Sequence, residues 1–125
     1  MALGQVLVVP PTALSPGTLG PVESPLLDPA ATKFVVVTTP VVWPVSGDVL
    51  KLTVEESQDG GATYRFSAGN SLAAVDGGIG LKKDGTPLLF DTWTTTFMFA
   101  GASRKLRLTL EVLQACTVGA TVSVQ

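Results

Sequence analysis

Apolar and polar residues alternate along much of the chain after about residue 33. Val49–Glu55 places leucine and valine at every second position, with lysine, threonine and glutamate between them. Asp91–Ala100, Arg104–Val112 and Thr117–Val124 repeat this period of two. Such alternation is typical of a β-strand that buries one face and exposes the other. The pattern predicts that these segments are strands of antiparallel sheets.

Further strands are expected where β-branched and aromatic residues cluster. Lys33–Thr39 has this composition, and shorter strands are expected at Gln5–Val9, at Thr63–Phe66 and, flanked by prolines, at Val41–Trp43. Ser67–Leu81 is rich in glycine and small residues, which predicts a long connection. About seven or eight short strands without a convincing helix predict an all-β fold. We expect an antiparallel β-sandwich, either immunoglobulin-like or a jelly roll.

The first part of the chain differs from the rest. Residues 1–31 contain two charged residues, Glu23 and Asp28, and prolines at positions 10, 11, 16, 21, 25 and 29. So many prolines argue against a helix and favour extended backbone. The segment is apolar, whereas disordered tails are usually charged, so it is expected to lie on another surface. The sequence predicts an extended, proline-rich N-terminal arm over residues 1–31 and a sandwich domain over residues 32–125. The arm packs either on its own domain or across a neighbouring subunit.

The low charge content changes the expected surface. Charged residues make up 14% of the chain, against roughly 25% in a typical soluble domain. A surface so poor in charge is expected to be covered by copies of the chain or by another partner. The net charge of −2 and a pI near 4.9 argue against a nucleic-acid partner, which needs a basic surface.

Candidate chemistry is sparse. The chain has no histidine and one cysteine, Cys116, which excludes a serine–histidine triad, a histidine-ligated metal and an intrachain disulfide. Four aspartates lie beside a glycine, where this residue commonly serves a turn: Asp48, Asp59, Asp76 and Asp84. We therefore expect no enzyme, no metal site and no cofactor.

The apolar start lacks a basic residue and is cut short by a pair of prolines, so no signal peptide or membrane segment is expected.

One local pattern is more specific than composition. The segment from residue 57 to residue 64 has the form Ser-x-Asp-x-Gly-x-Thr-Tyr, and its pattern residues are Ser57, Asp59, Gly61, Thr63 and Tyr64. The pattern resembles the Asp-box hairpin of sialidase-type propellers and other β-rich proteins. The carboxylate accepts backbone N–H bonds across the turn, the glycine permits a positive φ, and the ring is expected to anchor the return strand in the core. The resemblance implies a structural hairpin, and a single such box does not indicate a sialidase.

The overall pattern resembles the small β-sandwich structural proteins of tailed bacteriophages, namely head decoration, head–tail joining and tail-associated proteins. The Ser57–Tyr64 hairpin, the two C-terminal alternating segments and the proline-rich arm carry this resemblance. It implies a non-enzymatic virion protein on the capsid or tail surface. Its partners would be copies of itself, trimers above all, and other virion proteins such as the major capsid protein. The arm would supply the contact residues Val6, Leu7, Val8, Val9, Leu14, Leu19, Leu26 and Leu27.

Two other functions remain open. A carbohydrate- or cell-surface-binding module would expose aromatic rings, and Trp43, Trp93, Tyr64 and the phenylalanines are candidates for such a face. Core packing is the default expectation for each ring, because aromatic residues make up only 6% of the chain. An enzyme would need two of the aspartates close together in a deep cleft.

Overall fold

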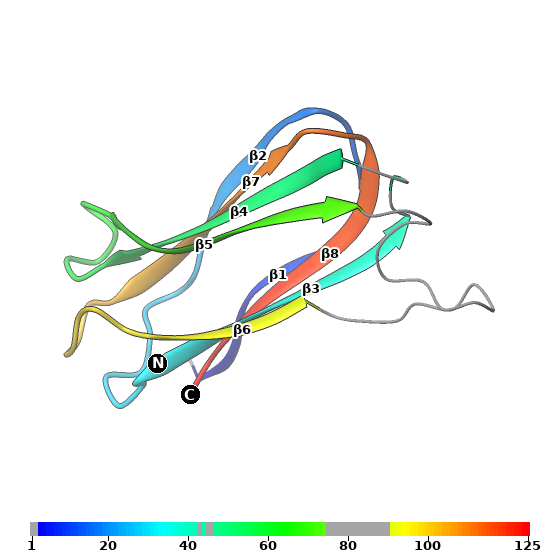
Figure 1. Cartoon of the computed structure of the whole chain (residues 1–125). Helices are drawn as coiled ribbons and strands as arrows, with labels where there is room; N and C mark the ends of the chain where they lie inside the picture. The colour runs from blue at the N-terminus through cyan, green and yellow to red at the C-terminus, as the bar shows by residue number, and fades with distance from the viewer. Residues whose placement is uncertain (1–2, 43, 45–46, 75–90) are drawn as a thin grey trace.

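Two four-stranded antiparallel sheets make up the protein (Figure 1). The structure is a computed structural model that describes residues 3–42, 44, 47–74 and 91–125, and for residues 70–74 and 91–93 the backbone. The strands are β1 (Gly4–Leu14), β2 (Gly17–Glu23), β3 (Lys33–Val42), β4 (Gly47–Ser57), β5 (Arg65–Ala74), β6 (Asp91–Thr96), β7 (Lys105–Val112) and β8 (Cys116–Val124). In these ranges no helix is long and apolar enough to cross a membrane.

The strand order is that of a jelly roll. One sheet has the order β1-β8-β3-β6 and the other has the order β2-β7-β4-β5. β1 pairs with β8, β2 with β7, β3 with β6 and β4 with β5, as in one long hairpin rolled into two sheets. Along the chain the strands alternate between the sheets, except that β4 and β5 are neighbours in one sheet. The predicted antiparallel β-sandwich is confirmed, and the topology selects the jelly roll from the two types expected.

The core lies between the two sheets and consists of the inward residues of the alternating strands. On β4, Leu50, Leu52 and Val54 are buried, whereas Lys51 between them is exposed. β7 and β8 bury their apolar positions in the same way. Each fully buried leucine or valine contributes about 1.5–3 kcal/mol relative to an exposed one. The apolar contacts between the sheets therefore supply most of the stability of the fold.

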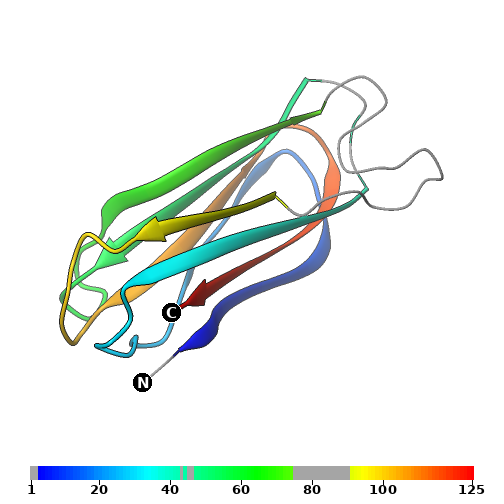
Figure 2. The same ribbon diagram turned by 60° about the horizontal axis from the view of Figure 1, so that its bottom comes forward.

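The extended arm expected over residues 1–31 is not present. Residues 4–31 form β1, β2 and the connection to β3, with one strand at an edge of each sheet. β1 runs beside β8 (Figure 2). In this pair Gly4 lies opposite Val124. Of the residues expected to contact a partner, four are buried, namely Val6, Leu7, Val9 and Leu27. Leu14 and Leu19 are partly buried and pack against the core. Val8 and Leu26 are exposed. Most of these side chains therefore belong to the chain's own core or pack against it.

The prolines of this segment fit into strands because of their positions. β1 and β2 are edge strands, in which one side of the backbone needs no ladder hydrogen bond. The pair Pro10-Pro11 lies where the β1–β8 register shifts, and Pro21 lies where the β2–β7 register shifts. Composition correctly indicates a non-helical segment here. It does not distinguish a separate arm from an edge strand with bulges.

Other boundaries also differ from the expectation. The long connection expected from residue 67 is strand up to Ala74, because β5 pairs along the whole of β4. β3 continues through Pro40 to Val42, with a register shift against β8. The strand expected over Asp91–Ala100 is shorter in the structure, where β6 ends at Thr96. Trp43, Asp76 and Asp84 lie outside the described residues.

Two buried charged side chains hold the loops at one end of the sandwich. Arg104, 2% exposed, donates hydrogen bonds to backbone carbonyl oxygens of the β2–β3 and β6–β7 loops, those of Asp28, Pro29, Ala31, Phe99 and Gly101. Glu56, which is equally buried, accepts from the backbone N–H groups of Met98 and Phe99 and from the hydroxyl of Ser67. Both charges are satisfied by the polypeptide itself, so their role is structural.

Candidate functional site

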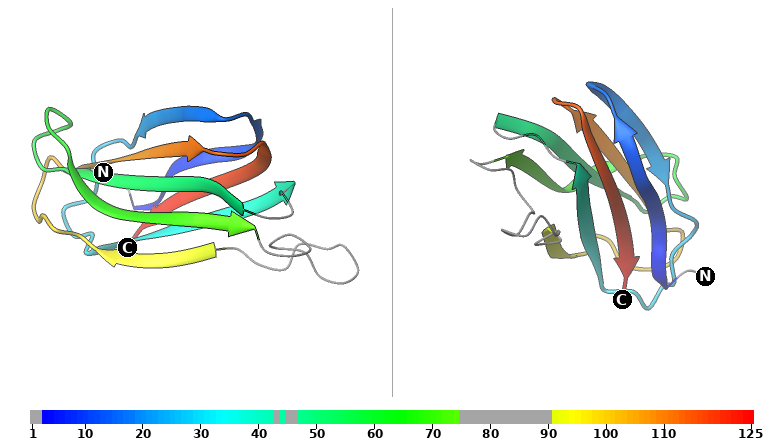
Figure 3. Two further views of the ribbon diagram at one scale, coloured as in Figure 1. Left: turned by 45° about the horizontal axis from the view of Figure 1, so that its top comes forward. Right: turned by 90° about the vertical axis from the view of Figure 1, so that its right-hand side faces the viewer.

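One sheet carries charged and aromatic residues across its outer surface. On β2-β7-β4-β5, the register places Glu23, Arg107, Glu55 and Phe66 in one row that crosses all four strands. The left view in Figure 3 looks onto this sheet. The neighbouring rows contain Thr53, Thr109, Lys51 and Glu111. We call this surface, formed by the three rows, the charged face.

Arg107 lies within the row of charged residues, between Glu23 and Glu55. Its Nε and Nη2 atoms donate to the two carboxylate oxygens of Glu55 at 2.8 and 3.1 Å. Its guanidinium carbon lies 4.2 Å from the centroid of the Tyr64 ring. The hydrogen bonds to Glu55 raise the pKa of Arg107 above its usual value. A partly exposed ion pair of this kind stabilises the fold by at most about 1 kcal/mol, but its two parallel bonds fix the plane of the guanidinium.

Tyr64 covers Arg107 and connects it to β2. The Tyr64 hydroxyl donates to Glu23 at 2.9 Å, and the Lys105 ammonium lies 3.7 Å from the other oxygen of the same carboxylate. Burial and the bond to Glu23 raise the pKa of Tyr64 to about 12, so the hydroxyl remains a neutral donor at ordinary pH. The ring was expected in the core. It lies instead on the outer surface, where it stacks on the cationic side chain of Arg107.

Phe66 is the aromatic end of the row. Its side chain is 64% exposed, more than any other large hydrophobic residue in the described part of the chain. Its Cε2 and Cζ atoms lie 3.3 and 3.4 Å from the point where a β-carbon on Gly69 would stand. The ring therefore covers a glycine, and a larger residue at position 69 would displace it. An exposed aromatic ring held in one place on a sheet is a candidate contact for a ligand or partner.

The Ser57–Tyr64 hairpin brings Tyr64 and Phe66 to this surface. Hydrogen bonds from the Thr63 hydroxyl, the Ser57 hydroxyl and the Thr63 backbone N–H lower the pKa of Asp59 to about 2. The Ser57 hydroxyl also accepts from the backbone N–H of Gly61 at 2.9 Å, and Gly61 has the positive φ expected at this turn. The side-chain bonds expected within the hairpin are thus present. They close the turn and start β5 one residue beyond Tyr64.

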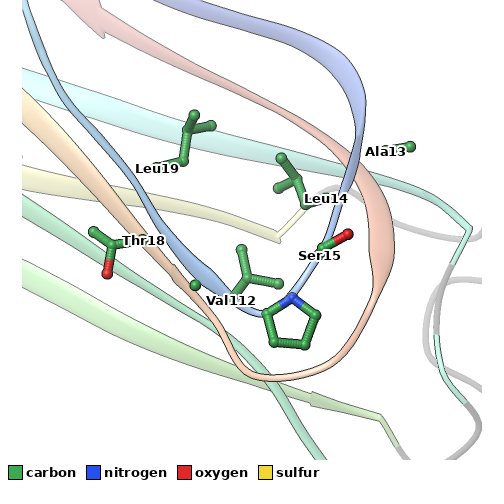
Figure 4. Close-up of a pocket in the computed structure, with 8 residues that line it drawn as sticks. Ala13, Leu14, Ser15, Thr18, Leu19 and Val112 are labelled. Carbon is green, nitrogen blue, oxygen red and sulfur yellow. The ribbon is translucent and has the colours of Figure 1, made fainter.

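A small pocket lies at the turn between β1 and β2 (Figure 4). Its volume is about 230 Å³, and it is lined by Ala13, Leu14, Ser15, Pro16, Gly17, Thr18, Leu19 and Val112. Ligand pockets usually have about 300–1,000 Å³ and a few polar groups that fix the ligand's orientation. This pocket is smaller and none of its lining residues is charged, so the charged face is the better candidate site.

Metal and thiol chemistry find little support in the described part of the chain. No group of three or more histidine, cysteine, aspartate or glutamate side chains there could hold a metal ion. Cys116 is buried at the start of β8, and burial raises the pKa of its thiol. A raised pKa leaves little of the reactive thiolate at neutral pH. Cys116 is therefore a core residue.

Sequence comparison identifies no relative: no protein-family model matches the chain, and no curated protein matches it. Solved structures do resemble it. The Yersinia pseudotuberculosis-derived mitogen matches 96% of this chain and 87% of its own, with a TM-score of 0.50 and 8% identity. The K1 cleaved adhesin domain of Lys-gingipain from Porphyromonas gingivalis W83 matches 82% of this chain and 60% of its own, with a TM-score of 0.50 and 12% identity.

A carbohydrate-binding module, TmCBM61, solved with β-1,4-galactotriose, matches 83% of this chain and 60% of its own, with a TM-score of 0.41 and 14% identity. The mitogen and the adhesin domain show that the fold is a known β-sandwich. At these identities the likeness concerns the fold alone.

Sequence reasoning did not single out the row on the charged face. Glu55 and Arg107 occupy outward positions of two alternating segments. Phe66 is one of the rings that the sequence offers for a binding face, but the sequence does not show which side of its strand it faces. An acidic and a basic side chain that both point outward, such as those of Glu55 and Arg107, predict an ion pair if their strands are neighbours. The signal becomes visible only when the β4–β7 register is known.

Proposed function

We propose that the protein is a non-enzymatic β-sandwich module that binds carbohydrate through the charged face. The exposed Phe66 ring at the end of the Glu23–Arg107–Glu55 row carries this proposal. A pyranose ring presents one face of C–H groups, which packs against an aromatic ring as other apolar groups do. Its hydroxyl groups can at the same time bond to ionised side chains beside the ring, and such bonds are among the stronger ones.

The polar part of the row is suited to hydroxyl groups. Each carboxylate oxygen of Glu55 has two lone pairs, and the bonds from Arg107 occupy one on each. The remaining lone pairs can accept from a sugar, and the hydroxyls of Thr53 and Thr109 lie in the next row. Because Glu55 and Arg107 already hold each other in place, a ligand would have to order few side chains on binding.

The same contacts favour binding over catalysis. Glycoside hydrolysis uses two carboxyl groups that flank the bond, one acting as an acid. On the charged face Glu55 is bonded to Arg107, while Glu23 is bonded to Tyr64 and lies beside Lys105. Both carboxylates are therefore engaged by cations or by a hydroxyl donor, which suits recognition of a ligand.

An array of neutral and acidic oligosaccharides tests the proposal. We expect the wild-type protein to retain a subset of the glycans, and we expect Phe66→Ala to weaken that binding at least about 10-fold in calorimetric titration, because the stacking surface is lost. Met98→Ala is the matched control, since Met98 is also an exposed large hydrophobic residue, 51% exposed, but lies outside the row. Glycan binding that is equal in the wild type and Phe66→Ala would refute the role of this face.

A structural role in a phage particle is the second candidate. It is supported by the low charge content of the chain and by the outer face of the β1-β8-β3-β6 sheet, which carries a single charged residue among its described side chains. Such a role requires no glycan. If the wild-type protein retains nothing from the array, the structural role becomes the better proposal.

A further inference from the structure

The outer face of the β1-β8-β3-β6 sheet is built almost wholly from uncharged residues. The register places Gln5, Ser123, Val35 and Thr94 in one row, Val8, Thr121 and Val37 in the next, and Ala13, Thr117 and Val42 in another. We call these rows the uncharged face. Among the described side chains of this surface, Lys33 at the start of β3 is the one charged group, and it lies beyond the first row.

Apolar side chains protrude from the uncharged face. Val8 is 53% exposed in the second row and Val42 is 60% exposed in the last. The residues around them are mostly valine, threonine and serine, which form an even surface on a sheet. A partner that covers this face would bury apolar area without leaving an unpaired charge behind, and unpaired buried charges are what usually oppose association.

A second copy of the chain satisfies the chemistry of this face. The chain has a net charge of −2, so two copies repel each other least when they approach through surfaces without charge. Serine and threonine hydroxyls both donate and accept hydrogen bonds, so identical rows can satisfy one another across a two-fold axis. A charged partner would find no counter-charge in these rows.

The face is also large enough, and one edge of the sheet is blocked. The rows extend about 20 Å along the strands and about 20 Å across the four strands, or about 400 Å² per copy, so two copies would bury on the order of 800–1,000 Å² in total, the size of a weak, transient interface. At the β1 edge, Pro10 and Pro11 lie at a register shift and cannot donate to an added strand. Packing of face on face is thus favoured over strand addition at that edge.

We propose that two copies of this chain form a dimer by packing their uncharged faces together. The contact is isologous, because each copy contributes the same residues. The charged faces lie on the opposite sides of the two sandwiches and point away from the interface (Figure 1). The dimer would therefore present two Phe66 surfaces in opposite directions. The contact itself rests on the uncharged face and does not depend on sugar binding.

Light scattering and sedimentation equilibrium of the full chain test the dimer. We expect a mass of twice the 12.9 kDa of one chain at tens of micromolar protein. Val8→Arg should raise the dissociation constant at least about 100-fold, because the two-fold axis places two unpaired charges in one interface. Met98→Arg is the matched control, since Met98 is 51% exposed, close to the 53% of Val8, and lies in the β6–β7 loop outside the uncharged face. It should leave the mass unchanged.

Circular dichroism and thermal unfolding establish that each variant is folded. If Val8→Arg does not fold, Val42→Arg replaces it, because Val42 is more exposed and lies at the end of β3. A wild-type protein that stays monomeric at about 100 μM, well above the range of a micromolar dimer, would overturn the proposal. A dimer as tight in the folded arginine variant as in the wild type would overturn it too, as would a trimer.

Discussion

Two charged residues, Arg104 and Asp59, are held by hydrogen bonds from within the chain. Arg104 is almost fully buried and reaches backbone carbonyls in two loops, while its guanidinium lies 4.6 Å from the centroid of the Phe97 ring. Asp59 is exposed, yet its carboxylate accepts from Thr63 and from Ser57. The first residue joins distant segments and the second closes a local turn. Arg104 therefore stabilises contacts between loops, whereas Asp59 stabilises its own hairpin.

Asp59 predicts a specific dependence of stability on pH. Its pKa is lowered from 3.8 to about 2 in the folded chain, so its stabilising effect is complete above about pH 4 and is lost as pH falls toward 2. Asp59→Asn cannot ionise and lacks this effect at every pH. We expect the free energy of unfolding of the wild type to exceed that of Asp59→Asn at pH 6, and the gap to narrow between pH 4 and pH 2.

Urea denaturation of both proteins across this pH range measures that gap. The remaining carboxyl groups are the same in the two chains, so their titration cancels in the difference. A gap that is the same at pH 6 and at pH 2 would show that the charge of Asp59 does not stabilise the hairpin.

Edge strands are the elements in which this fold departs most from regular geometry. The register of β1 and of β2 shifts against the single neighbour of each strand, and the prolines within these two strands, Pro10, Pro11 and Pro21, lie at such shifts. A bulge lets a strand bend and ends regular pairing, which protects an edge from adding further strands. In β2 the bulge also brings the backbone of Gly20 close to β7, where a β-carbon would stand 2.8 Å from the carbonyl oxygen of Leu108.

Gly20→Ala should destabilise the protein by about 2 kcal/mol or more, because φ at this position is +98° and the added methyl group would contact backbone atoms. Gly4→Ala is the matched control: φ is +75°, but no atom lies within 4 Å of the added carbon. Its cost should be about 1 kcal/mol, that of the backbone conformation alone. Equal losses for both variants in urea denaturation would show that β2 does not approach β7 this closely.

For the whole molecule, the jelly roll makes stability depend on both ends of the chain. β1 pairs with β8 and β2 pairs with β7, so the first strands complete the sheets that the last strands occupy. Val6, Leu7 and Val9 also belong to the core. The N-terminal segment is therefore part of the cooperative folding unit of the sandwich.

Removal of residues 1–23 should abolish cooperative folding, because it deletes β1 and β2 and uncovers the core beside β7 and β8. Removal of residues 1–3, which precede β1, is the control and should leave the thermal transition in place. Scanning calorimetry and near-ultraviolet circular dichroism measure both variants. A cooperative transition in the chain that lacks residues 1–23 would show that the segment is an appendage to an independent sandwich.

Much of the fold class follows from the sequence, because a period of two directly reports which side of a strand is buried. Val49–Glu55 and Arg104–Val112 were placed correctly for this reason, and the turn at Asp59 followed from local hydrogen bonding that needs only neighbouring residues. In the N-terminal segment only the strand at Gln5–Val9, a part of β1, was predicted. The rest of β1 and all of β2 were missed because their prolines hide the alternation. Whether such a segment joins a sheet depends on the distant strands β7 and β8, which supply its hydrogen bonds.

The candidate site depends mainly on contacts between distant strands: the sequence offers Tyr64 and Phe66 as candidate rings but does not bring them together with Glu55 and Arg107. Glu55 and Arg107 are 52 positions apart, and Tyr64 reaches Glu23 across 41 positions. The outward direction of each side chain can be derived from local alternation, but their meeting in one row depends on the order and register of four strands. Side chains on a sheet interact with their cross-strand neighbours, and those neighbours are chosen by the packing of the whole sandwich. Local periodicity therefore decides what each strand buries, and only the assembled sheets decide which exposed residues act together.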